Sequence, residues 1–270
     1  MEAATVALIP SWNRAMKIPV MRGVIDRRIL VNYQVDPLVL APLLPAPFRP
    51  KIVNGRAMVG ICLIRLKHLR PSGFPAWLGI STENAAHRSA VEWDADGKVC
   101  EGVYVRRRDT NSWFNTLAGG RLFPGFHSHA QFTVEETAEQ FHVALRSDDG
   151  VTSMVVRGRR TAELPAASVF RSLEECSTFF QGGSLGYSAT SDPARFQGLE
   201  LQCLNWQVEP LDVEAVRSSF FEDESLFPKG SIQFDCALLM RGIEHQWMGR
   251  SDLCCQQPAP KANEVVTAQA

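Results

Sequence analysis

Apolar and alternating runs of strand length recur along most of the chain. Residues 24–35, VIDRRILVNYQV, are rich in β-branched side chains, and residues 56–69, RAMVGICLIRLKHL, form a long apolar run. Both patterns are typical of β-strands. The segment DADGK carries Asp-Gly turn chemistry, so residues 82–93 and 98–108 are predicted to form a β-hairpin. Further strands are predicted for residues 127–135, 140–147, 151–160, 198–210 and 231–243.

Three short segments have helical signals instead. In DPLVLAPLLP, Asp36 is a candidate N-cap and Pro37 suits the first helical position. In SLEECSTFFQGG, Ser172 and Glu175 have capping-box spacing, and paired glycines end the segment. The third, DVEAVRSSFF at residues 212–221, places its apolar residues on one helical face.

These elements predict a mainly β (α+β) fold in one domain. About nine strands and three short helices follow one another without β-α-β alternation, which favours an antiparallel sheet or β-barrel with helices packed on it. The domain is expected to span residues 21–250, after an N-terminal arm at 1–20 and before a disordered, polar C-terminal tail at 251–270.

Composition narrows the range of partners. A formal charge of −1 gives no global field toward nucleic acid or an anionic membrane surface. No apolar run approaches the roughly 18 residues that a membrane span requires. Seven cysteines without Cys-x-x-Cys spacing, and no credible signal peptide, indicate reduced thiols in a cytoplasmic protein.

The stretch GGRLFPGFHSHAQF ends in two closely spaced histidines. On a strand, His127 and His129 share one face with Gln131 and Thr133, while Ala130 and its apolar neighbours face the other way. The pair could be solvated, could line a polar pocket, or could chelate a metal ion with at least one further ligand.

Two other strands carry candidate chemistry. In STENAAHR, Glu83 and His87 share one face, and Asn84 and Arg88 share the other. A carboxylate enclosed in a cavity can serve as a general acid or base, whereas on a surface strand it would pair with neighbouring charges.

The arginine run in GVYVRRRD adds a candidate anion site. Arg107 shares its face with Val103 and Val105, whereas Arg106 and Arg108 share theirs with Tyr104. An arginine on an apolar face must be paired or must bind an anion such as a carboxylate. Motifs for a serine hydrolase elbow, a P-loop, a dinucleotide fold and a zinc protease are absent from the sequence.

DRRILVNYQVDPLVLAPLLPAPF resembles the opening of acetoacetate decarboxylase-like proteins, with a basic strand, a Tyr-x-x-Asp-Pro helix start and a Leu-Pro-x-Pro ending. GRAMVGICLIRLKHLRP, ENAAHRSAVEW, GVYVRRRDTNS and LAGGRLFPGFHSHA resemble the YqjF-like branch of that superfamily, whose function is unknown. The resemblance covers most of residues 22–250 and implies a mainly antiparallel, cone-like β-barrel with an internal pocket, often in a homo-oligomer.

The resemblance also implies where the site should lie. The decarboxylases form a Schiff base on a lysine whose position here falls near His127, yet no lysine occurs between Lys98 and Lys229. Their pocket glutamate matches Glu83, and their carboxylate-binding arginine matches Arg27 or Arg28 approximately. Imine chemistry needs a primary amine, so it is not carried over.

The sequence is therefore compatible with two alternative functions. One is an enzyme that transfers protons on a small oxo-acid or polyketide-like substrate without a cofactor. His127 or Glu83 would be its catalytic base, and an arginine would hold the anionic group. Arg27, Arg28, His87, Arg107 and His129 are the candidate substrate-binding residues. The alternative is a non-catalytic protein that binds a small molecule in the same pocket.

Overall fold

The computed structural model describes residues 6–8, 19–113, 116 and 124–255. Its strands are β1 (Val6–Leu8), β2 (Met21–Val35), β3 (Arg49–Pro50), β4 (Ile52–Val53), β5 (Arg56–Pro71), β6 (Ile80–Ala95), β7 (Lys98–Thr110), β8 (His127–Glu136), β9 (Gln140–Ser147), β10 (Ser153–Arg160), β11 (Leu185–Ala189), β12 (Arg195–Cys203), β13 (Glu209–Ser218) and β14 (Ile232–Cys255). The helices are α1 (Pro37–Leu40) and α3 (Leu173–Gly182), with 3₁₀ turns η1 (Ala41–Leu43) and η2 (Ala76–Leu78). The prediction of a mainly β fold with a few short helices is confirmed.

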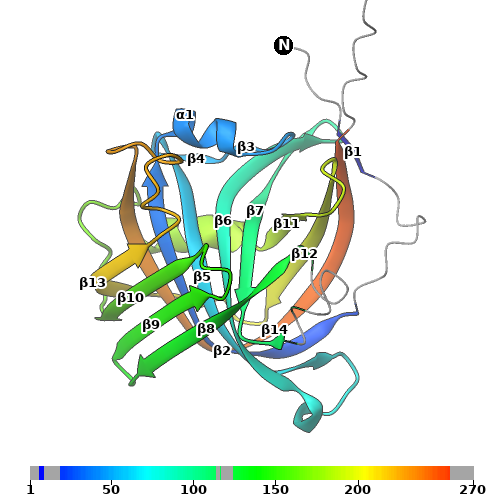
Figure 1. Cartoon of the computed structure of the whole chain (residues 1–270), viewed down its shortest axis with the longest axis vertical. Coiled ribbons are helices and arrows are strands. Elements are labelled where there is room, and N and C mark those ends of the chain that lie inside the picture. The colour runs from blue at the N-terminus through cyan, green and yellow to red at the C-terminus, as the bar shows by residue number, and fades with distance from the viewer. Residues whose placement is uncertain (1–5, 9–18, 114–115, 117–123, 256–270) are drawn as a thin grey trace, which may run out of the picture.

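The strands form one sheet that closes on itself in two rings. The long strands β14, β2, β5, β6 and β7 form a wall that both rings share. Strands β11 and β12 close the first ring, and β8, β9, β10 and β13 close the second on the other side of the wall (Figure 1). Because β7 pairs in parallel with both β8 and β11, the sheet is mixed, although the other pairings are antiparallel.

Side-chain alternation along the wall gives each ring its own core. Ile29 and Val31 of β2 pack in the core of the second ring, whereas Leu30 between them packs on the opposite side. Helix α3 covers that opposite side with Cys176 and Phe180. Each wall strand therefore contributes to both rings, and a shift of one residue moves a side chain from one ring to the other.

Local sequence signals set several of these elements. Asp36 caps α1 by accepting a hydrogen bond from the Leu38 amide, and Ser172 caps α3 by accepting one from the Glu175 amide. The β6–β7 hairpin turns at Asp96 and Gly97, whose φ angles are 50° and 72°. That left-handed conformation is the one that Asp-Gly turns favour, so the predicted hairpin is confirmed.

The helix predicted at 212–221 is wrong, because residues 209–218 form β13. Val213 and Val216 pack on the same core although they are three residues apart. The register against β10 shifts between Arg157 and Gly158, which leaves Glu214 as an extra residue in a β-bulge. The extra residue of a bulge delays the alternation of side chains by one position, so Val213 and Val216 both point inward. Their spacing of three residues is the one expected on a helical face.

The ends of the domain also differ from the prediction. Strand β14 continues to Cys255, past the expected boundary at 250, and β1 in the expected arm pairs with its last residues. Strand β11, which the sequence pattern did not indicate, pairs β12 with β7. The rest of the predicted arm and tail, 1–5, 9–18 and 256–270, lies outside the described residues, as does most of the segment 114–123. None of the described helices is long and apolar enough to cross a membrane.

Candidate functional site

The first ring encloses a cavity of about 100 Å³. It lies against the wall strands and beneath β11 and β12, beside the residues that follow α3. Since a cavity of about 150 Å³ holds benzene, this one suits a ligand of a few non-hydrogen atoms. Its polar lining includes Arg28, Asn84, Arg88, Arg108 and His127, together with Asp109, whose carboxylate is paired with Arg107.

Small side chains in the middle of the wall open the space. Leu30, Cys62, Ala86 and Arg108 stand opposite one another on β2, β5, β6 and β7. Cys62 and Ala86 are short, so the longer arginines around them have room to extend over the wall. The cavity therefore depends on the strand register, which places short side chains next to long ones across adjacent strands.

Three arginines around the cavity have only neutral hydrogen-bond partners. Arg28 donates from Nε to Cys62 Sγ at 3.2 Å, and Arg88 donates from Nη2 to Asn32 Oδ1 at 2.6 Å. Arg108 donates from Nη2 to Ser188 Oγ at 3.2 Å. Among the described residues, none of the three forms an ion pair with a carboxylate.

Burial makes the positive charge of two of these arginines costly. It lowers the pKa of both Arg88 and Arg108 to about 10, and the nearby sulfur of Cys62 opposes part of that shift. The Nε atoms of the two side chains are buried without a hydrogen-bond partner among the described residues. Both guanidinium groups still carry a proton at neutral pH, so the cavity is electropositive.

His127 enters the same cavity from the start of β8, where it pairs in register with Arg108. Burial, and next the charge of Arg108, lower the pKa of His127 to about 3, although a backbone hydrogen bond with Gly125 acts in the opposite direction. The imidazole is therefore neutral at physiological pH, and it can accept a proton or a hydrogen bond.

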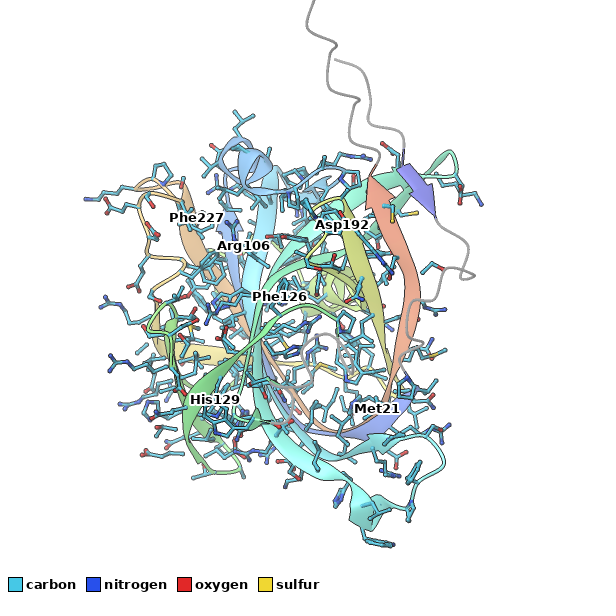
Figure 2. The ribbon with its side chains drawn as sticks, turned by 45° about the vertical axis from the view of Figure 1, so that its right-hand side comes forward. Met21, Arg106, Phe126, His129, Asp192 and Phe227 are labelled. Carbon is cyan, nitrogen blue, oxygen red and sulfur yellow. The ribbon has the colours of Figure 1, made fainter. Side chains whose placement is uncertain are left out.

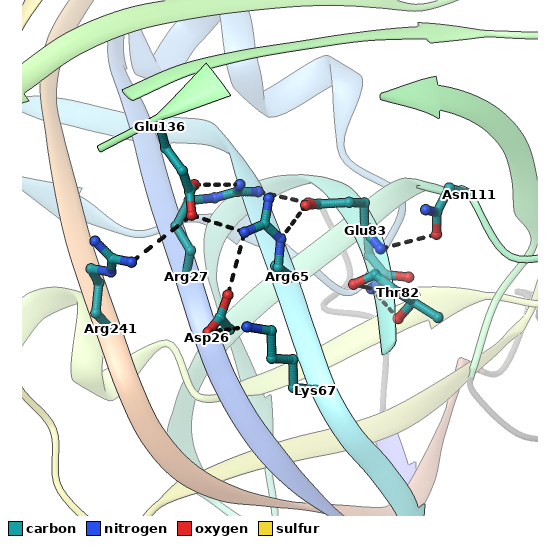
Figure 3. Close-up of polar contacts among 10 residues, drawn as sticks. Asp26, Arg27, Arg65, Lys67, Thr82, Glu83, Asn111, Glu136 and Arg241 are labelled. Atoms are coloured by element: carbon teal, nitrogen blue, oxygen red, sulfur yellow. Dashed lines mark hydrogen bonds and ion pairs between the residues drawn. The ribbon is translucent and has the colours of Figure 1, made fainter. Parts of the chain in front are cut away.

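Glu83 and Arg27 lie elsewhere, in a network of ion pairs on the second-ring side of the wall (Figure 3). Glu83 Oε2 accepts from Arg27 Nη2 at 2.6 Å, and its Oε1 accepts from Arg65 Nε at 2.6 Å. Glu136 bridges the same two arginines at 3.0 and 2.8 Å. The expectation that Glu83 and His127 share a cavity is not met, because alternation along β6 points Glu83 away and Asn84 inward.

His87 and Arg107 also face away from the cavity. His87 packs its ring on Phe220 and Phe221 at centroid distances of 5.1 and 5.8 Å, inside the second ring. Arg107 is paired with Asp109 and Asp149, both at 2.8 Å. Their expected role in binding a substrate has no support from this placement.

His129 is engaged at the outer face of β8. Its Nδ1 lies 2.6 Å from Asp148 Oδ2, and its ring stacks on Trp113 at 3.8 Å. In Figure 2, His129 lies below Arg106 and Phe227, which both line a separate small pocket. Among the described residues, no group of three His, Cys, Asp or Glu side chains is placed to hold a metal ion, so His127 and His129 lack the third ligand that chelation requires.

Of the residues that line the cavity, His127 and Arg28 were therefore predicted as site residues, whereas Asn84, Arg88 and Arg108 were not. A signal for them was present. Asn84, Ala86 and Arg88 share one face of β6, and Ala86 is a small residue between two polar ones. What the sequence could not show is that this face of β6, rather than the face of Glu83, meets Arg108 across a cavity.

Comparisons with known proteins agree with this architecture. Residues 25–242 match the model of the DUF2071 family, described as an uncharacterized conserved protein, and no curated protein matches the sequence. The structure is similar to acetoacetate decarboxylase from Legionella pneumophila, with a TM-score of 0.57 and 11% identity over 93% of this chain and 92% of the other. It is similar to an acetoacetate decarboxylase-like enzyme from Sphingomonas wittichii RW1, with a TM-score of 0.55 and 11% identity over 93% and 99%.

A third similar structure is the enduracididine biosynthesis enzyme MppR complexed with pyruvate, with a TM-score of 0.50 and 13% identity over 90% of this chain and 94% of the other. At these identities the likeness shows a common fold and nothing finer. The chain belongs to the DUF2071 family and is an acetoacetate decarboxylase-like protein in its fold.

Proposed function

We propose that the protein is an enzyme that binds a small oxo-acid in the cavity of the first ring and transfers a proton on it through His127. The observation that carries the proposal is the set of three arginines around one small cavity, none paired with a described carboxylate. Holding three uncompensated positive charges around one cavity costs free energy in the protein without a ligand, and a bound anion offsets that cost.

The arginines favour a carboxylate ligand. Guanidinium groups bind carboxylates through strong charge-assisted hydrogen bonds. The Nε–H groups of Arg88 and Arg108 have no hydrogen-bond acceptor among the described residues, so they can donate to a ligand. The apolar lining, which includes Ile64, Val103 and Leu199, suits a short carbon chain. A small oxo-acid combines both features.

Proton transfer is the chemistry that the remaining groups support. A C–H bond next to a carbonyl can lose its proton to neutral His127, and the negative charge that develops on the carbonyl oxygen is stabilised by the adjacent guanidinium groups. A bound carboxylate would also offset the charge of Arg108, which is one cause of the low pKa of His127. Ligand binding would thereby make the imidazole a stronger base.

Imine formation does not fit the lining. No lysine lines the cavity among the described residues, and the sequence has none between Lys98 and Lys229. The pyruvate complex of MppR, a protein of similar fold, adds support for a small oxo-acid as the ligand class. We expect no covalent product when borohydride is added with pyruvate or acetoacetate.

The low pKa of His127 also favours a second function, a binding protein that holds the oxo-acid unchanged. The two functions share the arginines and differ only in whether the ligand exchanges protons. One experiment therefore separates them.

The test is binding and proton exchange with pyruvate and acetoacetate in deuterated buffer. We expect both ligands to bind by calorimetry and their C–H protons to exchange for deuterium by NMR. His127→Gln should abolish exchange and keep binding. Exchange absent from the wild type despite binding would leave the binding protein as the function.

Arg108→Met tests the anion site directly. Because a hydrogen bond to a charged group contributes about 1.5–3 kcal/mol, binding should weaken by roughly 10- to 100-fold. Arg106→Met is the matched control and should bind normally, because Arg106 is an exposed residue of the same strand that lines a different pocket. Equal affinity of the wild type and Arg108→Met would refute the anion site.

A further inference from the structure

Cys62 places a sulfur atom in the wall of the electropositive cavity. It lies on β5, lines the cavity, and is 7% exposed. Its Sγ accepts a hydrogen bond from Arg28 Nε at 3.2 Å. Arg88 and Arg108 line the same cavity, so Cys62 shares its surroundings with all three cavity arginines.

The other described cysteines have different surroundings. Cys176 and Cys236 are fully buried with their sulfurs 3.9 Å apart, and hydrogen bonding to Cys176 together with burial raises the pKa of Cys236 well above its usual value. Burial also raises the pKa of Cys203, although the charge of Arg28 opposes part of that shift. Reactive cysteines occupy electropositive, partly accessible sites, and buried apolar thiols are inert. Only Cys62 combines a cavity wall with three neighbouring guanidinium groups among the described cysteines.

We propose that Cys62 is a nucleophile for small carboxylates that carry an electrophilic carbon. The proposal rests on the anion site proposed above and adds a covalent step to it. The arginines would hold the carboxylate within the cavity, and a cavity this small keeps the rest of the ligand near the sulfur.

With a 2-oxo acid the step is a reversible addition. The sulfur of Cys62 forms a bond to the ketone carbon, and the π pair of the C=O bond moves to the oxygen. The thiol proton ends on that oxygen, so the product is a hemithioketal and no oxidant or reductant is needed. Neutral His127 lines the same cavity and can carry the proton between the two atoms.

Alkylation by a matched pair of reagents tests the proposal in the full-length, reduced protein. Iodoacetate is an anion with an electrophilic carbon, whereas iodoacetamide is its neutral analogue. With either, sulfur displaces iodide and the thiol proton passes to the buffer. Peptide mapping by mass spectrometry gives the rate at each cysteine, and the partly exposed Cys100 serves as the internal control.

We expect iodoacetate to modify Cys62 at least about tenfold faster than iodoacetamide, because a positive cleft concentrates anions. Cys100 should show no such preference, pyruvate should slow the reaction at Cys62, and Arg28→Met should reduce the preference. Iodoacetamide reacting as fast at Cys62, or neither reagent reaching Cys62 in the native protein, would overturn the proposal.

The outcome separates the two proposals. A protein that binds pyruvate but leaves Cys62 unmodified retains the proposed function without the covalent step. A protein whose Cys62 prefers iodoacetate but whose reaction pyruvate does not slow retains the nucleophile and loses the oxo-acid as its ligand.

Discussion

At the scale of single residues, two kinds of buried charge lie on opposite faces of one wall. Arg27 is fully buried and contacts Glu83 and Glu136, so its charge is compensated within the protein. Arg88 and Arg108 donate hydrogen bonds only to neutral groups among the described residues. A compensated arginine contributes to the fold, whereas an uncompensated one contributes to binding, because only the latter gains from an added anion.

Glu83→Gln should therefore affect stability and not chemistry. Removing a charge from a buried ion pair leaves Arg27 and Arg65 undercompensated, and we expect the free energy of unfolding to fall by about 3 kcal/mol. Denaturant unfolding measures this loss. Glu135→Gln, whose side chain is 76% exposed, should change stability little. If folded Glu83→Gln protein bound pyruvate but no longer exchanged its protons, Glu83 would be the base after all.

His87 should make stability depend on pH. Burial, and next Arg107, lower the pKa of His87 to about 3 from 6.5, so the folded protein keeps it neutral where the unfolded chain binds a proton. The free energy of unfolding therefore falls as the pH drops below about 6.5, by about 1.4 kcal/mol for each pH unit from this residue.

His87→Leu should remove that contribution. Unfolding at about pH 7.5 and about pH 5 should differ by about 2 kcal/mol less in the variant than in the wild type. Both ring nitrogens of His87 are buried without a described hydrogen-bond partner, so the substitution removes no such bond. The same pH dependence in both proteins would contradict the assignment.

At the scale of elements, the sequence predicted correctly those features that depend on residues close together in the chain. The caps at Asp36 and Ser172 and the turn at Asp96 and Gly97 depend on neighbouring residues, and each is where the sequence predicts it. The segment 212–221 failed because a β-bulge, which only the partner strand β10 reveals, gives two valines a helical spacing.

Gly158 at this bulge offers a test of the assignment. A Cβ at Gly158 would lie 2.7 Å from the Asp212 carbonyl oxygen of β13, closer than van der Waals contact allows. Gly158→Ala should lower the free energy of unfolding by about 1–3 kcal/mol, as other overpacked sites do. Arg157→Ala, at an exposed position of the same strand, is the control. An equally stable Gly158→Ala variant would show that β13 does not approach β10 so closely.

At the scale of the whole molecule, the position of the site follows from ring closure. Glu83, Asn84 and Arg88 are all on β6, and the sequence shows that Glu83 faces away from the other two. Which face meets a cavity depends on β11, a strand of five residues that pairs in parallel with β7. Such a long-range pairing leaves little trace in local patterning, so the sequence alone did not favour the face of Asn84 and Arg88 over the face of Glu83, which the family resemblance indicated.

The division into two rings predicts which strands a bound ligand should protect from amide hydrogen exchange. An anion in the cavity should slow amide hydrogen exchange in β7, β11 and β12 and in the residues that follow α3, because these segments line it. The β9–β10 hairpin closes only the second ring and should exchange at an unchanged rate. At a pyruvate concentration of about 100 times Kd, linkage should add about 2.7 kcal/mol to the free energy of unfolding.

Hydrogen exchange followed by mass spectrometry, with and without pyruvate, checks this pattern. Arg108→Met is the control: at a pyruvate concentration near the Kd of the wild type, its roughly 10- to 100-fold weaker binding should leave the variant almost unprotected. Protection centred on β9, β10 and Glu83 would instead place the ligand in the second ring. The ion-pair network of Arg27 and Glu83 would then be the binding site, and the arginines around Cys62 would need another explanation. Because the two rings share their wall, only protection in the strands that belong to one ring can decide between them.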